Sequence, residues 1–151
     1  YNGAARLQQT LTDAELATLD PGFREVGIAG AEIMLTEFLD ANAAREEAGH
    51  KLNLFLDKYD LLLTPTLPIT AFEAGEEVPV GSGMDRWTRW TPFSYPFNLS
   101  RHPAATIPCG LCSNGLPAGL QIVGPINRDD KVLAASRAYD TVRPIALRDL
   151  G

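Results

Sequence analysis

Two extended, largely apolar segments separated by an Asn-Gly turn constrain the fold of this chain more than any other feature. The segments cover residues 104–109 and 118–123, and Ser113-Asn114-Gly115 joins them. Asn-Gly tolerates the positive φ angles that a tight hairpin turn requires, and the β-branched residues beside it favour extended backbone. The sequence therefore predicts a β-hairpin within residues 98–125.

Helices are predicted through most of residues 1–58. Thr12 and Glu15 have the spacing of a capping box, so a short helix should begin there and end near Leu19. Asp20-Pro21-Gly22 is expected to break that helix. A long helix is predicted over residues 31–58, with a bend or close packing at Gly49. One face of it should be formed by Leu35, Phe38, Leu39, Asn42, Gly49, Leu52, Phe55 and Leu56.

A buried strand, a long loop and a final helix complete the expected elements. The apolar run at residues 59–63 predicts a strand covered on both faces, within residues 59–66, because Pro65 and Pro68 should prevent its continuation. Residues 67–97 are predicted to form a long loop, which in a compact domain is often a binding wall or lid. Residues 126–143 should be helical, since Asp129 and Asp130 suit a helix N-terminus.

Size and charge narrow the classes of function. The chain has 151 residues, which fits one domain, and its net charge of −6 opposes a surface that neutralises phosphates. We therefore expect no nucleic-acid partner. No apolar run approaches the ~20 residues of a membrane helix, and two cysteines are too few for a disulfide scaffold. These features favour a soluble, cytoplasmic protein with no membrane partner.

The residues that could perform hydrolysis form no complete catalytic set. No serine lies in a Gly-x-Ser-x-Gly elbow, and Gly81-Ser82-Gly83 is typical of a turn. His50 is expected to be a solvated or core-edge residue of the long helix. His102 precedes Pro103 in a loop, where it is either a structural residue or close to a ligand. We assign no catalytic residue, and no cofactor is implied.

Cys109-Gly110-Leu111-Cys112 has the spacing of a redox dithiol or of half a zinc site. The pair precedes a hairpin turn rather than a helix N-terminus, and a second CxxC that would complete a zinc site is missing from the sequence. We interpret both residues as buried cysteines at a strand end and predict no metal site, with the redox or zinc function as an alternative.

Aromatic residues are concentrated in one short segment. Five of the twelve aromatic residues of the chain lie within residues 87–97, at Trp87, Trp90, Phe93, Tyr95 and Phe97. Such a cluster either packs a loop onto the core or lines a ligand pocket.

The order of several short motifs resembles the C-terminal part of amidase signature family enzymes. The motifs are Tyr59-Asp60-Leu61-Leu62-Leu63-Thr64-Pro65-Thr66, Pro92 with Pro96-Phe97-Asn98-Leu99, Pro103-Ala104, Pro108-Cys109-Gly110, the run from Asn114 to Gly124, and the closing Asp-rich helix. Arg45 also lies where such proteins often carry an arginine before the Tyr-Asp strand. One departure is Ser100-Arg101-His102-Pro103, because many relatives have a glycine near position 101.

This resemblance implies an α/β fold with a mixed sheet flanked by helices, and hydrolysis of carboxylic amide C–N bonds by a Ser-cisSer-Lys triad. In the family the triad lies upstream of the part that this chain resembles. This sequence has no Ser-Ser pair, and Lys51, Lys58 and Lys131 match no catalytic lysine motif. The resemblance also implies that the segment before Asn98 lines the substrate cavity, at Trp90, Thr91 and Phe93.

We therefore expect residues 1–151 to be the C-terminal segment of an amidase domain, inactive alone and incomplete without the N-terminal portion of the enzyme. The expected partners are that N-terminal portion, a small-molecule amide and, as a further option, a second copy of the chain, because central strands need neighbours on both edges. A non-catalytic interaction module on the same scaffold is the main alternative.

Overall fold

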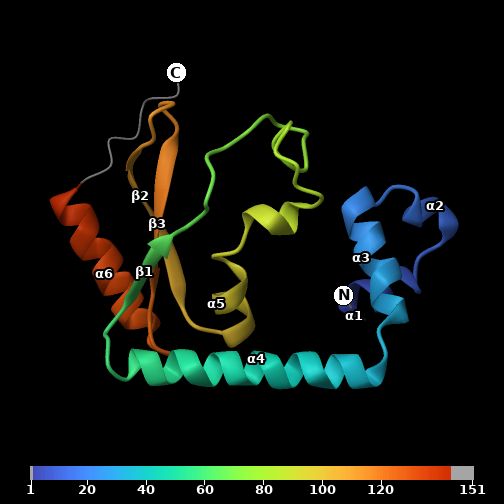
Figure 1. Ribbon diagram of the computed structural model, residues 1–151, viewed down its shortest axis with the longest axis horizontal. Helices are drawn as coiled ribbons and strands as arrows, with labels where there is room; N and C mark the ends of the chain where they lie inside the picture. Colours follow the sequence, from blue (N-terminus) through green and yellow to red (C-terminus); the bar gives the residue numbers. More distant parts are fainter. Residues whose placement is uncertain (1, 144–151) are drawn as a thin grey trace. The chain divides into compact units, whose positions relative to one another are not determined.

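The computed structural model describes residues 2–143. The chain divides into two compact units, with the boundary between Ala44 and Arg45. The first unit contains the helices α1 (Asn2–Gln8), α2 (Asp13–Leu16) and α3 (Pro21–Glu32), and helix α4 (Leu35–Leu56) runs across the boundary (Figure 1). The second unit contains β1 (Leu62–Pro65), the short 3₁₀ helix η1 (Trp87–Trp90), α5 (Tyr95–Ser100), β2 (Ala104–Leu111), β3 (Pro117–Val123) and α6 (Asp129–Val142).

Local capping determines where α2 and α3 begin. The predicted capping box is confirmed: Glu15 Oε2 accepts a hydrogen bond from the Thr12 amide at 2.8 Å, and Thr12 Oγ1 accepts one from the Glu15 amide at 3.4 Å. The expected extension of this helix to Leu19 is wrong, because α2 ends at Leu16. The role of Asp20-Pro21-Gly22 also needs correction, since this tripeptide starts α3 rather than only interrupting a helix.

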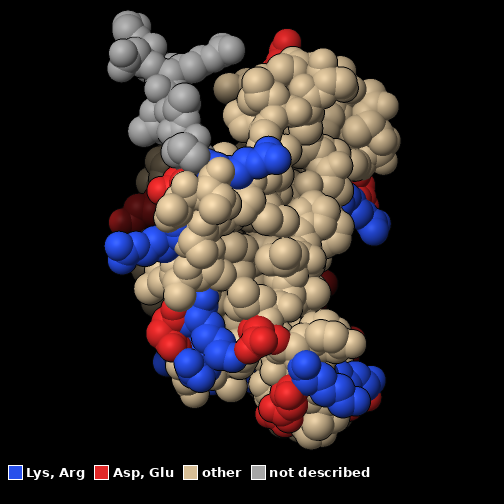
Figure 2. Space-filling model, turned by 90° about the vertical axis from the view of Figure 1, so that its left-hand side faces the viewer, with Lys and Arg blue, Asp and Glu red and all other residues tan. Residues whose placement is uncertain are grey.

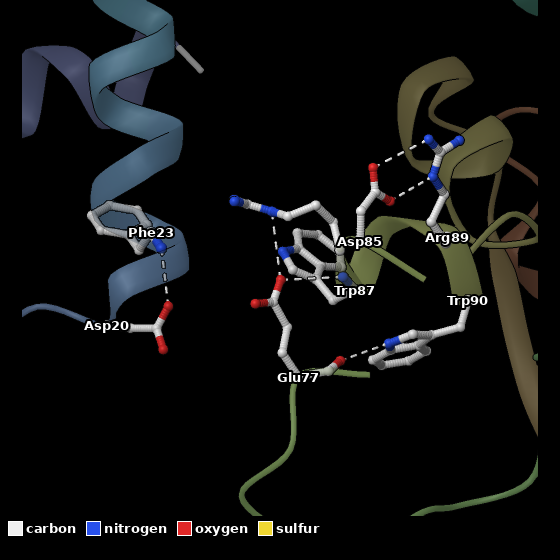
Figure 3. A network of polar contacts seen from close by, with 8 residues as sticks. Asp20, Phe23, Glu77, Asp85, Trp87, Arg89 and Trp90 are labelled. Carbon is white, nitrogen blue, oxygen red and sulfur yellow. Dashed lines mark hydrogen bonds and ion pairs between the residues drawn. The ribbon is translucent and has the colours of Figure 1, made fainter. Parts of the chain in front are cut away.

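The start of α3 follows from the residue types at its first positions. The Asp20 carboxylate accepts a hydrogen bond from the Phe23 amide at 2.9 Å (Figure 3). Pro21 occupies the first helical position, where its missing amide donor has no consequence. Helix α3 contacts α1 closely, and the buried Gly27 leaves room for the side chain of Gln8.

The long helix begins later than the periodicity predicts. Residues 31 and 32 belong to α3, Ile33 is extended, and α4 starts at Leu35. The Glu37 carboxylate accepts a hydrogen bond from the Met34 amide at 2.8 Å, which is the second half of a capping box and determines this start. The predicted apolar face is only partly covered: Leu56 is buried and Gly49 and Leu52 are half-buried, whereas Leu35, Phe38, Leu39 and Phe55 are exposed.

The predicted hairpin is confirmed and forms the centre of a three-stranded sheet. The strand order is β1-β3-β2, and both pairings are antiparallel, with Leu62 and Ala104 each opposite Val123. Gly115 has a φ of 79° in the turn, as the Asn-Gly signal requires. Helix α6 packs against β2 and β3 (Figure 1). Any parallel pairing of the expected mixed sheet thus lies outside the strands that the structure describes.

Strand β1 differs from the prediction in position and burial. It covers Leu62–Pro65 instead of residues 59–63, and its residues alternate between half-buried and exposed, with Leu63 57% exposed. The expected burial on both faces is therefore wrong. The register with β3 selects the later residues, and Pro65 is tolerated because it ends an edge strand.

The predicted loop and final helix are confirmed with shifted boundaries. The region from 67 to 97 includes η1 and the beginning of α5, so it is less irregular than expected. Helix α6 begins at Asp129, with Asp129 and Asp130 in its first turn as predicted. The Lys131 ammonium lies 2.8 Å from the Asp60 carboxylate and connects α6 to the residues before β1.

Candidate functional site

An open groove of about 870 Å³ runs beside the sheet in the second unit. Its lining consists of residues 63–72, Trp90, Cys109, Cys112 and residues 117–120. None of these residues is charged, and the polar groups on their side chains are three threonine hydroxyls, two thiols and the indole N–H of Trp90. The groove has the size of a pocket for a small molecule and fits uncharged, largely apolar ligands.

Trp90 forms one wall of this groove. Its ring meets the ring of Phe72, another lining residue, edge to face with centroids 5.6 Å apart. The Trp90 indole Nε1 donates a hydrogen bond to the backbone carbonyl of Glu77 at 3.0 Å. The apolar part of the indole is therefore available to the groove while its single polar atom is paired.

Polar contacts hold the helix η1 that carries Trp90. The Glu77 carboxylate accepts a hydrogen bond from the Trp87 amide at 3.2 Å and lies 3.5 Å from the Arg86 guanidinium (Figure 3). Arg89 forms an ion pair with Asp85 at 2.8 Å, which raises the pKa of the Arg89 guanidinium and lowers the pKa of the Asp85 carboxyl. Both partners of that pair are exposed, so it contributes little to stability.

Gln121 connects the sheet to the aromatic segment that follows η1. Its side chain lies in the central strand β3 and is buried, with 6% of the residue exposed. The amide Nε2 donates to Thr64 Oγ1 at 2.9 Å and to the carbonyl of Phe93 at 3.0 Å. Gln121 is not among the functional residues predicted from the sequence. A glutamine within an otherwise apolar strand is the one signal that could have identified it.

The three residues predicted to contact substrate have different positions. Trp90 lines the groove. Thr91 is buried, and its hydroxyl donates to the carbonyl of Thr88 at 3.4 Å. Phe93 is half-buried. Neither Thr91 nor Phe93 belongs to the lining of the groove, and contact of the three residues with substrate stays a prediction.

His102 is buried and both of its ring nitrogens are hydrogen-bonded. Nδ1 lies 2.9 Å from Ser100 Oγ, and Nε2 lies 3.0 Å from Asn53 Oδ1. Because a side-chain amide oxygen can only accept, Nε2 carries the proton and Nδ1 accepts from the serine. Burial lowers the pKa of His102. These contacts favour the structural role over proximity to a ligand, and His50 is exposed on α4, as expected for a solvated residue.

The two cysteines differ from the prediction of buried strand-end residues. Cys109 is exposed, Cys112 is half-buried, and both are free thiols that line the groove. The cause is a register shift between Pro108 and Gly110, which makes Cys109 an extra residue in β2. Among residues 2–143, no cluster of three histidine, cysteine, aspartate or glutamate side chains could hold a metal ion.

Charged residues of both signs lie close together on the surface. Figure 2 shows acidic and basic side chains in mixed groups on one face, next to a broad area without charged residues. Arg128 and Asp130 form one such exposed pair at 2.7 Å, and Arg128 lowers the pKa of Asp130 to about 2. This face thus presents no continuous basic surface.

Comparisons with known proteins agree with the motifs and the fold. A family model described as Amidase matches residues 8–133. The chain belongs to the amidase signature family. The resemblance inferred from the motifs is thereby confirmed, and so is the fold class of a sheet flanked by helices that forms part of the amidase signature fold.

Individual relatives of this amidase signature chain include two enzymes of different kinds. A glutamyl-tRNA(Gln) amidotransferase polypeptide of Acaryochloris marina is 36% identical over 103 residues, covering 68% of this chain and 21% of the relative. An acylamidase of Rhodococcus erythropolis is 34% identical over 110 residues, covering 70% and 23%. The crystal structure of a bacterial aryl acylamidase matches with a TM-score of 0.75 and 28% identity, covering 95% of this chain and 31% of that one.

The chain therefore spans between about a fifth and a third of the length of these relatives. Among the described residues, no helix has the length and apolar character needed to cross a membrane.

Proposed function

We propose that this chain is the C-terminal part of an amidase-type hydrolase that cleaves carboxylic amide C–N bonds. The match of the Amidase family to residues 8–133, together with the short span relative to its relatives, carries this proposal. The chain contributes sheet strands and one wall of the substrate cavity. The catalytic Ser-cisSer-Lys triad belongs to the N-terminal portion of the same enzyme, so residues 1–151 alone are inactive.

The groove beside β1 and β3 supplies the cavity wall. Its uncharged lining and the Phe72–Trp90 pair fit the apolar or aryl part of an amide. The names of two relatives, an acylamidase and an aryl acylamidase, agree with such substrates. We assign contact with the non-reacting part of the amide to Trp90, Thr91 and Phe93, and none of the bond-breaking steps.

The N-terminal portion of the enzyme covers apolar surface that this chain leaves exposed. Within residues 2–143, β1 and β2 each pair with β3 alone, so each has an unpaired edge. Large apolar side chains on α4 are exposed as well, among them Leu35 at 71% and Leu39 at 55%. Exposed strand edges and apolar faces of this extent mark surfaces that a neighbour covers. Self-association of the chain is the alternative outcome.

Two preparations test the proposal. The full-length polypeptide that contains these residues should hydrolyse aryl and aliphatic amides, and residues 1–151 expressed alone should not. Size-exclusion chromatography of residues 1–151 should give an associated or poorly folded species, and addition of the separately expressed N-terminal portion should convert it into a complex. Amide cleavage by residues 1–151 alone would contradict the assignment of the catalytic groups. A cooperatively folded monomer of residues 1–151 would favour an interaction module.

A further inference from the structure

We infer that Gln121 is a positioning residue that holds the aromatic wall of the groove against its floor. The inference rests on the proposed function, because the wall matters only if the groove receives the substrate. Gln121 itself does not line the groove, so it acts through the residues that it holds.

The hydrogen bonds of Gln121 join three segments that are distant in sequence. Thr64, which accepts from Nε2 at 2.9 Å, lies 57 residues before Gln121, and Phe93, whose carbonyl accepts at 3.0 Å, lies 28 residues before it. A side-chain amide has two N–H donors, and these two contacts use both. Since the residue is buried, neither donor can turn to bulk water if its partner moves away.

The Thr64 contact connects Gln121 to the floor of the groove. Thr64 lies in β1, lines the groove and donates from its hydroxyl to the carbonyl of Pro65 at 3.0 Å. With its own proton directed to that carbonyl, Thr64 Oγ1 acts only as an acceptor toward Gln121. The Gln121 amide thus has a fixed orientation, and its second proton is directed to Phe93.

The Phe93 contact holds one end of the aromatic segment, and Glu77 holds the other end. Three residues before Phe93, the Trp90 indole donates to the carbonyl of Glu77 at 3.0 Å. The backbone of residues 90–93 is therefore attached to the sheet at Phe93 and to the preceding loop at Trp90. Loss of the Gln121 contact frees the sheet end and allows the Trp90 ring, which forms the wall, to move relative to the floor.

A Gln121→Met substitution in the full-length enzyme tests this inference. Methionine keeps the approximate volume and removes both donors. We expect hydrogen–deuterium exchange in residues 90–94 to accelerate about fivefold, which corresponds to a hydrogen bond with a net worth of about 1 kcal/mol. KM for a bulky aryl amide should rise about fivefold with kcat nearly unchanged, because the wall contacts a non-reacting part of the substrate, and KM for a small aliphatic amide should change much less.

Asn53→Leu provides a matched control. Asn53 also has a side-chain amide that makes a contact between distant segments, at 3.0 Å to His102, and it does not line the groove. Its loss should lower the thermal stability without changing the ratio of the two KM values or the exchange of residues 90–94. A purely structural role of Gln121 would make the two variants indistinguishable in these readouts.

The readouts separate failure of the inference from failure of the proposed function. Unchanged exchange in residues 90–94 of Gln121→Met overturns the inference, whatever the enzyme hydrolyses. Faster exchange with an unchanged ratio of KM values refutes the role of this wall in substrate selection, which is part of the proposed function. Equal changes of exchange and KM ratio in Asn53→Leu also overturn the inference, because the effect would then follow from lower stability alone.

Discussion

A Gly119→Ala substitution should destabilise the protein, although alanine suits a strand better than glycine does. Gly119 lies in the central strand β3, and a Cβ atom added there would lie 2.7 Å from Thr66 Oγ1, 3.0 Å from Thr66 Cβ and 3.2 Å from Thr106 Cγ2. These neighbours come from both sides, since Thr66 follows β1 and Thr106 belongs to β2, and their hydroxyls lie 3.4 Å apart. Overpacking of this kind costs about 1–3 kcal/mol of folding free energy.

Gly49→Ala is the control with the opposite expected sign. Gly49 lies inside α4, and an added Cβ would meet Ser100 Cβ at 3.6 Å, which is an ordinary contact. Alanine inside a helix should therefore stabilise the protein by about 0.5–1 kcal/mol. Of the bend and the close packing expected at Gly49, the structure shows packing that leaves room for one methyl group.

Thermal unfolding of the full-length protein and its two glycine variants provides the measurement. We expect the melting temperature to fall for Gly119→Ala and to rise for Gly49→Ala. Combining Gly119→Ala with Thr66→Ala removes the shortest contact, so this double variant should recover part of the loss, with a coupling of about 0.5 kcal/mol or more. A melting temperature of Gly119→Ala at or above that of the unmodified protein would refute the close approach of the three strands.

Three further predictions concern the site and its surroundings. Trp90→Ala should raise KM for a bulky aryl amide roughly tenfold in the full-length enzyme, and much less for a small amide, because a large apolar contact is lost. Since burial lowers the pKa of His102, the folded protein favours the neutral ring, so its stability should fall as pH decreases below 6.5, by at most about 1.4 kcal/mol per pH unit. Melting temperatures at about pH 7.5 and pH 5.5, on either side of that value, should show this loss, and His102→Gln should reduce it. Tyr95→Phe should leave stability unchanged or raise it by up to about 1 kcal/mol in the same assay, because the buried hydroxyl has no partner within residues 2–143.

Each of these predictions has an outcome that contradicts it. Equal losses for both amides in Trp90→Ala would remove that residue from substrate selection. A pH dependence that is the same in His102→Gln would assign the effect to other groups. A large loss of stability in Tyr95→Phe would mean that the hydroxyl has a partner in the complete enzyme.

The features determined by neighbouring residues were predictable from the sequence. The hairpin follows from two β-branched segments and an Asn-Gly turn, and the start of α2 follows from Thr12 and Glu15. The start of α4 is equally local but was not predicted, because helical periodicity was allowed to override the pairing of Glu37 with the Met34 amide. A capping signal inside a periodic region thus determines a helix start more reliably than the period does.

The features determined by distant residues were not predictable in this way. Strand β1 lies later than predicted because β3 pairs with residues 62–65, and a continuous apolar run does not determine register. The exposure of Cys109 depends on the bulge in β2. Gln121 has its partners 28 and 57 residues away, so no local pattern connects it with the aromatic segment. The aromatic cluster itself did identify Trp90, because a concentration of aromatic residues is visible without knowledge of contacts.

The bulge and the proline of β2 have a consequence for handling the isolated chain. Pro108 lacks an amide donor, and the extra residue Cys109 increases the local twist, so the outer edge of β2 offers an interrupted template for another strand. Natural proteins use such residues to discourage amyloid-like stacking of sheets. Replacing Pro108 by valine and deleting Cys109 would therefore create a straight, aggregation-prone edge at the end of the hairpin.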